Sequence, residues 1–228
     1  MGKSILAGAV IAITLVVVLG LGGYLYLNSV GPDPDARRQE RVVVVFESAA
    51  EDGATVAALI SVVEDGKMLD VSPDSSVTVP GTSFSRIGDA FVFGGAAGVA
   101  RAIGDANGAP TAFVSVPQPV WLSAVEATSG VRVDMPLKIT SFDGVRLTTI
   151  PSGEQTLTAD QVAAVLSATP KLTQEESASL RRQLGRSLGG AVAAARPAPG
   201  ALKSDLPPDV LALWVQGVLS DASIGRGH

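Results

Sequence analysis

The sequence predicts an α/β domain in which helices cover both faces of a mixed β-sheet, preceded by one transmembrane helix. Three observations lead to this prediction: a long uncharged run near the N-terminus, β-branched runs separated by turn signals, and helical patterns with explicit start signals. Of 228 residues, 46% are hydrophobic and 17% are charged, which is enough apolar material for a core. Strand and helix patterns alternate along the chain, as in sheets covered by helices on both faces.

The composition excludes several kinds of chemistry. The chain has no cysteine, so disulfides, zinc–cysteine sites, iron–sulfur clusters and thiol nucleophiles are all ruled out. Its one histidine is His228, which leaves a Ser-His-Asp mechanism or a histidine-ligated metal without a suitably placed imidazole. The net charge of −5 provides no general basic field, so we expect no nucleic-acid partner.

The N-terminal run predicts a membrane anchor over residues 1–29. Residues 5–27 contain no charged side chain, and a helix of that length spans about 35 Å, which exceeds the roughly 30 Å of the hydrocarbon layer. Tyr24 and Tyr26 lie near its far end, where aromatic rings favour the membrane interface. No small-residue cleavage site follows directly, which favours an anchor over a removable signal. Residues 30–40 are polar and contain proline, as expected of a tether.

Basic residues stand on both sides of this segment, so charge bias alone leaves its orientation open. The short head favours a cytoplasmic N-terminus. We therefore expect a single-pass protein of the cell membrane whose C-terminal domain is extracytoplasmic.

The first half of the domain reads as strands followed by a helix. Residues 42–45 are four consecutive valines, which predict a strand buried on both faces. Residues 56–63 and 67–71 are separated by an Asp-Gly turn signal and predict a hairpin. Residues 85–107 have apolar side chains at helical intervals, with a break expected at two adjacent glycines, 94 and 95.

The second half contains further strands and helices. We expect a strand at 111–116, a helix at 120–128 and a strand at 131–135. Two later helices begin at capping boxes, where the hydroxyls of Thr158 and Thr173 and a side chain three residues later satisfy exposed amides.

The C-terminal part completes the predicted organisation. In the second capped helix, leucines at 180, 184 and 188 and Val192 form one buried stripe. Residues 196–204 are rich in proline and alanine and predict a linker, and two prolines then open a last amphipathic helix. The domain is therefore expected over residues 41–196, and 197–228 are expected to form the linker and the C-terminal helix.

Four stretches resemble, in order, segments of the LytR-CpsA-Psr (LCP) family, and the resemblance covers about residues 41–195. Residues 71–81 (VSPDSSVTVPG) resemble IPRDTYVPIPG, residues 86–95 (RIGDAFVFGG) resemble KINAAYAYGG, and residues 128–136 (TSGVRVDMP) resemble LGGVTVDVP. Residues 153–165, with Arg182 and Gln183 downstream, resemble G-x-x-x-L-x-G-x-x-A-L-x-Y followed by RQ.

The resemblance implies a layered α-β-α fold of LCP type and a role in cell-wall biogenesis. Members of the family attach lipid-linked glycopolymers to peptidoglycan. They hold the tail of a polyprenyl pyrophosphate in a hydrophobic pocket between sheet and helices, and they use arginines and Mg²⁺ at the pyrophosphate. The implied partners are the membrane, a polyprenyl-linked lipid or glycopolymer, and other cell-wall proteins.

The motifs carry over four candidate substrate-binding residues: Asp74, Arg86, Arg182 and Gln183. Asp74 occupies the position of an acidic residue and is the candidate ligand for Mg²⁺. Each residue also has a plainer interpretation. Asp74 can close a turn, Arg86 can be a solvated surface charge, and Arg182 can pair with an acid such as Glu176. Gln183 lies next to the leucine stripe and has no independent chemical signal.

The sequence departs from the family pattern where arginines are expected. Pro73, Ser167 and Thr169 occupy three of those positions, and the second predicted strand carries no charge. Because bidentate guanidinium contacts to phosphate are not replaced in kind by other groups, we expect impaired catalysis. The leading hypothesis is an envelope protein that binds a polyprenyl-linked lipid or an active LCP enzyme. The alternatives are an active phosphotransferase and a non-catalytic scaffold that acts through its last helix, so the sequence leaves enzymatic activity open.

Overall fold

The computed structural model describes residues 41–50, 53–78, 81–83, 85–108, 111–142, 147–169, 172–198 and 200–220. The chain divides into two units, Met1–Arg37 and Arg38–His228. The predicted anchor at 1–29 and tether at 30–40 lie outside the described residues, so all that follows concerns the second unit.

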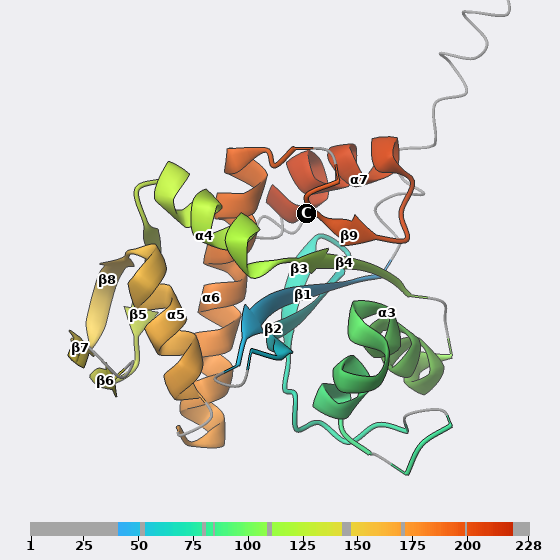
Figure 1. The fold of residues 1–228 in the computed structure, drawn as a ribbon, viewed down its shortest axis with the longest axis horizontal. Coiled ribbons are helices and arrows are strands. Elements are labelled where there is room, and N and C mark those ends of the chain that lie inside the picture. The colour runs from blue at the N-terminus through green and yellow to red at the C-terminus, as the bar shows by residue number, and fades with distance from the viewer. Residues whose placement is uncertain are drawn as a thin grey trace, which may run out of the picture. The chain divides into compact units, whose positions relative to one another are not determined.

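A five-stranded mixed sheet forms the centre of this unit (Figure 1). Its strand order is β3-β2-β1-β4-β9, with β1 parallel to β4 and the other neighbours antiparallel. The strands are β1 (Val42–Ala49), β2 (Thr55–Glu64), β3 (Lys67–Val71), β4 (Ala112–Val116) and β9 (Lys203–Ser204). The predicted mixed sheet is therefore confirmed.

Strand β1 lies in the middle of the sheet, and its four valines are 0% exposed, which confirms a strand buried on both faces. Val44 packs in one hydrophobic cluster and Val45 in the other, because successive side chains point to opposite faces. The predicted hairpin is formed by β2 and β3. Its turn places Asp65 and Gly66 at φ 49° and 67°, the left-handed backbone that tight hairpin turns require.

Helices cover both faces of the sheet, as the alternating pattern predicted (Figure 1). Helix α3 (Ile87–Asn107) packs on one face. Helices on the other face are α4 (Gln118–Ala127), α5 (Ala159–Ala168) and α6 (Gln174–Ala195). Helix α7 (Pro208–Trp214) continues into the π-helical turn η2 (Val215–Leu219).

Helix α3 is broken where its two adjacent glycines predicted a break. Gly95 has φ 57° and ψ −152°, which no helix accommodates and which glycine adopts without strain. Among the residues that the structure describes, α3 alone is long and apolar enough to cross a membrane, with a mean hydropathy of 1.2. Its Val99 and Ala102 are 0% exposed and pack in the cluster that contains Val43 and Val45. Packing in the core therefore accounts for part of the apolar character of this helix, while Val92 and Phe93 are 72% and 56% exposed.

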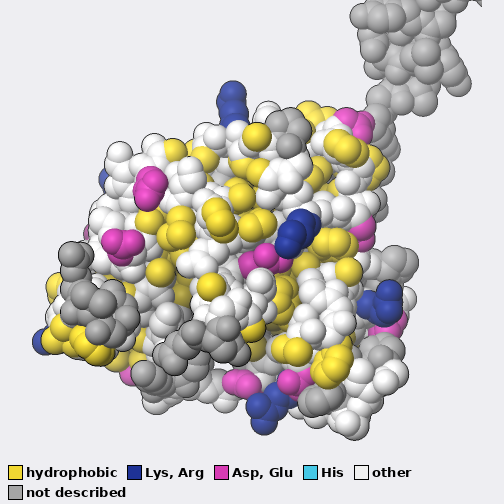
Figure 2. Space-filling model, viewed as in Figure 1, with side chains coloured by type: hydrophobic (Ala, Val, Ile, Leu, Met, Phe, Trp, Pro, Cys, Tyr) yellow, Lys and Arg dark blue, Asp and Glu magenta, His cyan; other side chains and the backbone are white. Residues whose placement is uncertain are grey.

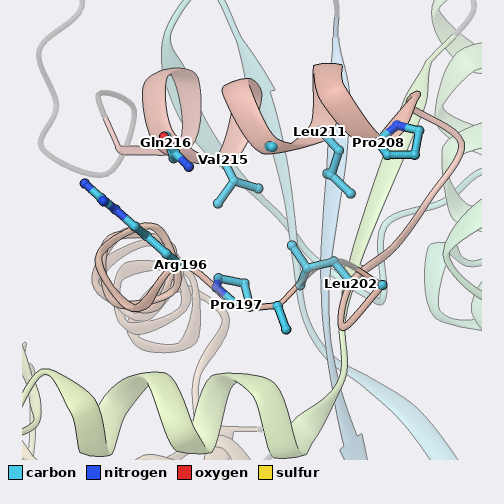
Figure 3. Close-up of a pocket in the computed structure, with 10 residues that line it drawn as sticks. Arg196, Pro197, Leu202, Pro208, Leu211, Val215 and Gln216 are labelled. Atoms are coloured by element: carbon cyan, nitrogen blue, oxygen red, sulfur yellow. The ribbon is translucent and has the colours of Figure 1, made fainter.

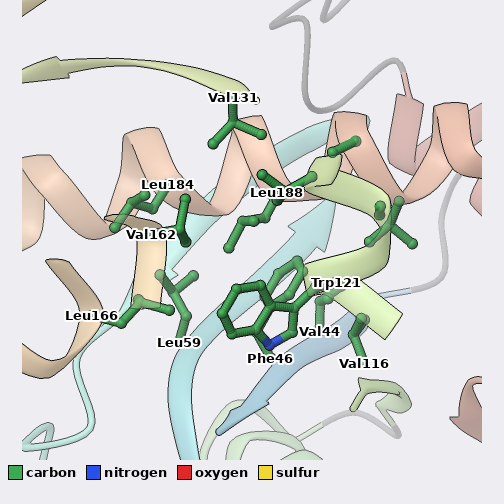
Figure 4. Packing of buried hydrophobic residues seen from close by; sticks show 14 of the residues in the cluster. Val44, Phe46, Leu59, Val116, Trp121, Val131, Val162, Leu166, Leu184 and Leu188 are labelled. Carbon is green, nitrogen blue, oxygen red and sulfur yellow. The ribbon is translucent and has the colours of Figure 1, made fainter. Parts of the chain in front are cut away.

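Helices α5 and α6 begin at the predicted capping boxes. The Thr158 hydroxyl accepts a hydrogen bond from the Gln161 amide at 3.4 Å, and the Gln161 side chain accepts one from the Thr158 amide at 2.9 Å. Thr173 and Glu176 make the same reciprocal pair in α6. The predicted leucine stripe of α6 is 0% exposed, and Figure 4 shows Leu184 and Leu188 packed with Phe46 and Trp121.

Three short strands on this side of the domain, β6 (Ile139–Phe142), β7 (Leu147–Ile150) and β8 (Gly153–Leu157), were not predicted. Strand β5 (Val131–Met135), itself predicted, pairs with β8, and β6 pairs with β7. Strands β6, β7 and β8 are four or five residues long and partly polar, so they lack the apolar run that indicates a strand.

The predicted linker at 196–204 differs from the structure because its end forms β9 against β4. The helix that follows is also part of the domain. Its Trp214 and Val215 are only 4% exposed and pack in the larger hydrophobic cluster, the one that contains Val44, which we call the main core. Two apolar side chains of the helix that the scaffold alternative invokes therefore pack inside the domain, whereas Leu213 is 52% exposed, and the scaffold alternative stays a prediction.

Candidate functional site

Asp74 and Arg86, two of the four predicted site residues, lie side by side. Asp74 follows β3 and Arg86 immediately precedes α3. The Ile87 amide donates to the Ser75 carbonyl at 3.0 Å, and this contact draws the two segments together. Nη1 of Arg86 is 3.5 Å from Oδ1 of Asp74. The side chains are 65% and 82% exposed, so water and salt weaken their attraction.

A second pair of the same chemistry, which the sequence analysis missed, joins β3 to α6. Nε of Arg181 lies 3.1 and 3.2 Å from the two carboxylate oxygens of Asp70, and Nη2 lies 3.2 Å from Oδ2. The two side chains are 8% and 7% exposed. The sequence does contain a signal for the burial of Arg181. Arg181 lies three residues before Leu184, so the two side chains lie on the same, buried face of the helix.

The surroundings of Asp70 perturb its titration. Burial raises the pKa of the Asp70 carboxyl above its ordinary value of 3.8, because the charged form loses contact with water. The hydrogen bond from Arg181 and the charges of Arg181 and Arg182 lower that pKa and offset part of the rise. Arg182 therefore acts electrostatically on this buried pair.

Arg182 and Gln183 occupy different environments. Arg182 is exposed and makes no hydrogen bond or ion pair with the described residues. Its suggested partner Glu176 is instead bonded to Thr173, whose hydroxyl lies 2.6 Å from Oε2 of Glu176. Oε1 of Gln183 accepts a hydrogen bond from the Asp134 amide at 2.8 Å, which ties α6 to β5.

Gln183 also lines a polar groove of about 420 Å³ beside strands β5 and β8. The charged residues of this groove are Arg132, Asp134 and Glu154. The structure thus pairs Asp74 with Arg86 and places Arg182 near Asp70, whereas Gln183 is held at the β5 edge.

The described residues form no complete protein cage for a magnesium ion. Among them, no group of three or more histidine, aspartate or glutamate side chains is close enough to hold a metal. Oδ1 of Asp74 faces a guanidinium instead. Since Mg²⁺ is commonly bound through one or two carboxylates together with substrate phosphates, Asp74 alone offers a single ligand. The Mg²⁺ implied by the resemblance stays a prediction.

The side chains between sheet and helices are tightly packed where the resemblance implied a hydrophobic pocket. Phe46, Leu59, Leu184, Leu188 and Trp121 are each 0% exposed (Figure 4). An apolar tail cannot lie between them unless they move apart, because they leave no accessible surface. On the face shown in Figure 2, Lys and Arg side chains are scattered, several beside acidic ones, and they form no continuous basic area there.

Comparison with known proteins supports the fold. No family model matches the sequence, and no curated protein sequence matches it significantly. Bacillus subtilis TagV matches with a TM-score of 0.57 and 15% identity, covering 80% of each chain. TagT bound to LI-WTA matches with a TM-score of 0.57 and 16% identity, covering 83% of this chain and 78% of that one.

A Streptococcus agalactiae protein, gbs0355, matches with a TM-score of 0.61 and 10% identity, covering 83% of this chain and 76% of that one. These structural neighbours are LCP-family proteins, as the sequence motifs led us to expect. The described part of this chain has the LytR-CpsA-Psr fold.

Proposed function

We propose that this protein is a cell-envelope protein of LCP fold that binds a lipid-linked glycopolymer through its anionic head and transfers it poorly. The observation that carries the proposal is that acids of the chain itself pair with two of the three arginines near the end of β3. Arg181 is paired with Asp70 and Arg86 with Asp74.

The pairing bears on catalysis because a pyrophosphate leaving group requires convergent, preorganised positive charge. Arg181 directs both Nε and Nη2 at Asp70 inside the protein. Turning it toward a phosphate would leave a buried carboxylate without its counter-charge, which is strongly unfavourable. Arg86 shares its charge with Asp74, so Arg182 is the exposed guanidinium near this cluster without an acidic partner among the described residues.

The shared fold supports the binding part of the proposal, because TagT has been solved bound to LI-WTA. The exposed Arg86 and Arg182 are accessible to a phosphate. Because the side chains between the sheet and α6 are fully buried, we assign recognition to the head of the lipid and not to burial of its tail there.

The proposal includes a membrane anchor at residues 1–29, with residues 5–27 as the transmembrane helix. Their length and lack of charge support it. With a cytoplasmic N-terminus, the LCP-fold domain lies outside the cytoplasm, where a lipid-linked glycopolymer meets peptidoglycan.

The test is titration of the full chain in lipid nanodiscs with a short-chain polyprenyl pyrophosphate, with and without Mg²⁺. We expect saturable binding that Arg182→Ala weakens roughly tenfold or more, because a charge-assisted hydrogen bond is lost. Arg101→Ala removes an exposed arginine of α3 and is the matched control. Absence of binding both with and without Mg²⁺ would rule out the proposal. Equal weakening of binding by Arg182→Ala and Arg101→Ala would also contradict it, because the lipid would then respond only to the overall charge of the protein.

A second candidate is an active phosphotransferase with a rearranged site. The observation that favours it is the 3.5 Å approach of Arg86 to Asp74, which puts a carboxylate and a guanidinium, a proton acceptor and a phosphate-binding group, at one surface position. This candidate predicts transfer of the glycopolymer to peptidoglycan that Arg182→Ala abolishes while the unfolding midpoint stays unchanged. Transfer that persists in that variant would exclude a site built on Arg182.

A further inference from the structure

A separate cavity lies beyond the region that carries the family resemblance, between the end of α6 and helix α7. Its volume is about 120 Å³, and most of its lining is apolar. The apolar members include Pro197, Leu202, Pro208, Leu211, Ala212 and Val215. Arg196 and Gln216 are the polar members, and Figure 3 shows both at one end of the cavity, with Leu202, Leu211 and Pro208 toward the other.

The walls of this cavity are fixed to the rest of the domain. The Ser204 hydroxyl donates to the Phe113 carbonyl at 2.7 Å, and Asp205 accepts a hydrogen bond from the Phe113 amide at 2.9 Å. Leu202 and Val215 are 9% and 4% exposed and pack in the main core. The cavity is therefore preformed, as small-molecule sites commonly are.

Arg196 adopts a strained conformation at the mouth of this cavity. It caps the C-terminus of α6 with φ 49° and ψ 67°, a left-handed backbone for which glycine is the usual choice. Its side chain is exposed and makes no hydrogen bond or ion pair with the residues that the structure describes. A positive charge near a helix C-terminus is stabilising because it interacts favourably with the helix dipole. An arginine or lysine within the last turn of α6 would provide the same charge with ordinary helical backbone angles. The helix dipole therefore does not explain the strained backbone of Arg196. The strained backbone and unpaired charge together indicate a function for this side chain.

We infer that this cavity binds a small anionic amphiphile, a short hydrocarbon group that ends in a carboxylate or phosphate. The apolar wall takes the hydrocarbon, and the guanidinium of Arg196 and the amide of Gln216 take the anionic end. The size fits, because an apolar cavity of about 150 Å³ binds benzene. This inference does not depend on the proposed function, because none of the residues that line this cavity is among the candidate substrate-binding residues Asp74, Arg86, Arg182 and Gln183.

The test uses the full chain in nanodiscs and hexanoate, which is water-soluble and carries one negative charge. The chain has two tryptophans, so labelling with 5-fluorotryptophan gives two fluorine NMR signals. Trp214 is next to the lining residue Val215, and Trp121 is buried in the sheet–helix core as an internal reference. We expect hexanoate to shift the Trp214 signal saturably. We expect hexanol to bind roughly tenfold more weakly or worse, and hexylammonium not to bind.

Variants separate binding from folding. Arg196→Gly relieves the left-handed strain, so the unfolding midpoint should not fall, while hexanoate affinity should drop to the level of hexanol. Arg186→Ala removes an exposed arginine of α6 that does not line the cavity and should leave binding unchanged. Ala212→Leu places a larger side chain in the lining and should weaken both hexanoate and hexanol.

Four results would overturn the inference. They are absence of a saturable shift with hexanoate, equal binding of hexanoate and hexylammonium, and unchanged hexanoate affinity in Arg196→Gly. The fourth is hexanoate binding that appears only after residues 221–228 are removed, because it would identify the end of the chain as the occupant.

Discussion

Two aspartate–arginine pairs lie near the end of β3, and they differ in burial more than in chemistry. Asp70 and Arg181 are 7% and 8% exposed, whereas Asp74 and Arg86 are 82% and 65% exposed. The buried pair joins a strand to a helix through two nitrogens of one guanidinium. The exposed pair makes one long contact. The comparison teaches that an arginine near a family motif is available to a ligand only if the fold has not already given it a partner.

The largest expected effect is on stability, at the buried pair. Asp70→Ala leaves the guanidinium of Arg181 buried without its counter-charge, and we expect it to lower the free energy of unfolding by about 3–5 kcal/mol. Asp74→Ala is the matched control at the exposed pair, where the loss should be about 0–1 kcal/mol. Urea unfolding followed by tryptophan fluorescence measures both. Similar losses in the two variants would contradict the contrast in burial.

Replacement of both buried partners sharpens the same comparison. In the double variant Asp70→Leu with Arg181→Met, no charge is left unpaired, so the free energy of unfolding should return to within about 1 kcal/mol of the wild type or exceed it. The same urea experiment measures it. A double variant as unstable as Asp70→Ala would mean that the ion pair itself contributes net stability.

A smaller effect is expected at the two capping boxes. Thr173→Ala and Thr158→Ala each remove a hydroxyl that accepts a backbone amide at a helix start. Each should lower the free energy of unfolding by about 1 kcal/mol. The corresponding serine variants keep the hydroxyl and should lose less than the alanine variants. Equal losses for serine and alanine would show that the caps contribute little.

The smallest expected effect is the pH dependence of two carboxyls, with opposite signs. The pKa of Asp70 is raised by burial above 3.8, so the folded chain binds this proton more tightly than the unfolded chain. Asp70 therefore adds stability as the pH falls through its raised pKa. Hydrogen bonds from Thr173 lower the pKa of Glu176 below 4.5, so Glu176 stabilises the fold above that pH and loses its contribution as the pH falls through the lowered pKa.

Carbon NMR titration of the two carboxyl groups measures these shifts directly. Glu176→Gln should keep the capping hydrogen bonds and remove only the pH dependence of that helix start. A pKa of Asp70 at or below 3.8 would contradict the first assignment, and a pKa of Glu176 at or above 4.5 would contradict the second.

The sequence predicted the elements whose signals are local. The valine run of β1, the Asp-Gly turn between β2 and β3, the glycine break in α3 and both capping boxes depend on neighbouring residues, and all are present. Strand β9 could not be predicted, because two residues in a segment rich in proline and alanine become a strand only by pairing with β4.

The candidate site was harder to predict than the fold because its geometry depends on contacts distant in sequence. Asp70 and Arg181 are 111 positions apart, and neither matches a motif. Gln183 follows Arg182 in the chain, yet it is held at β5, because adjacent residues on a helix point in different directions. The motifs therefore identified the right helix without identifying which of its side chains are buried, paired or exposed.

The most direct test of the central claim is single-turnover transfer from one lipid-linked glycopolymer donor, measured for the full chain beside TagT under identical conditions. We predict a rate at least about a hundredfold below that of TagT, since each lost preorganised charge donor costs a factor of about 10² to 10³. Donor binding should still be measurable. A rate within tenfold of TagT would contradict the claim that the pairing of these arginines leaves the site unable to catalyse efficient transfer.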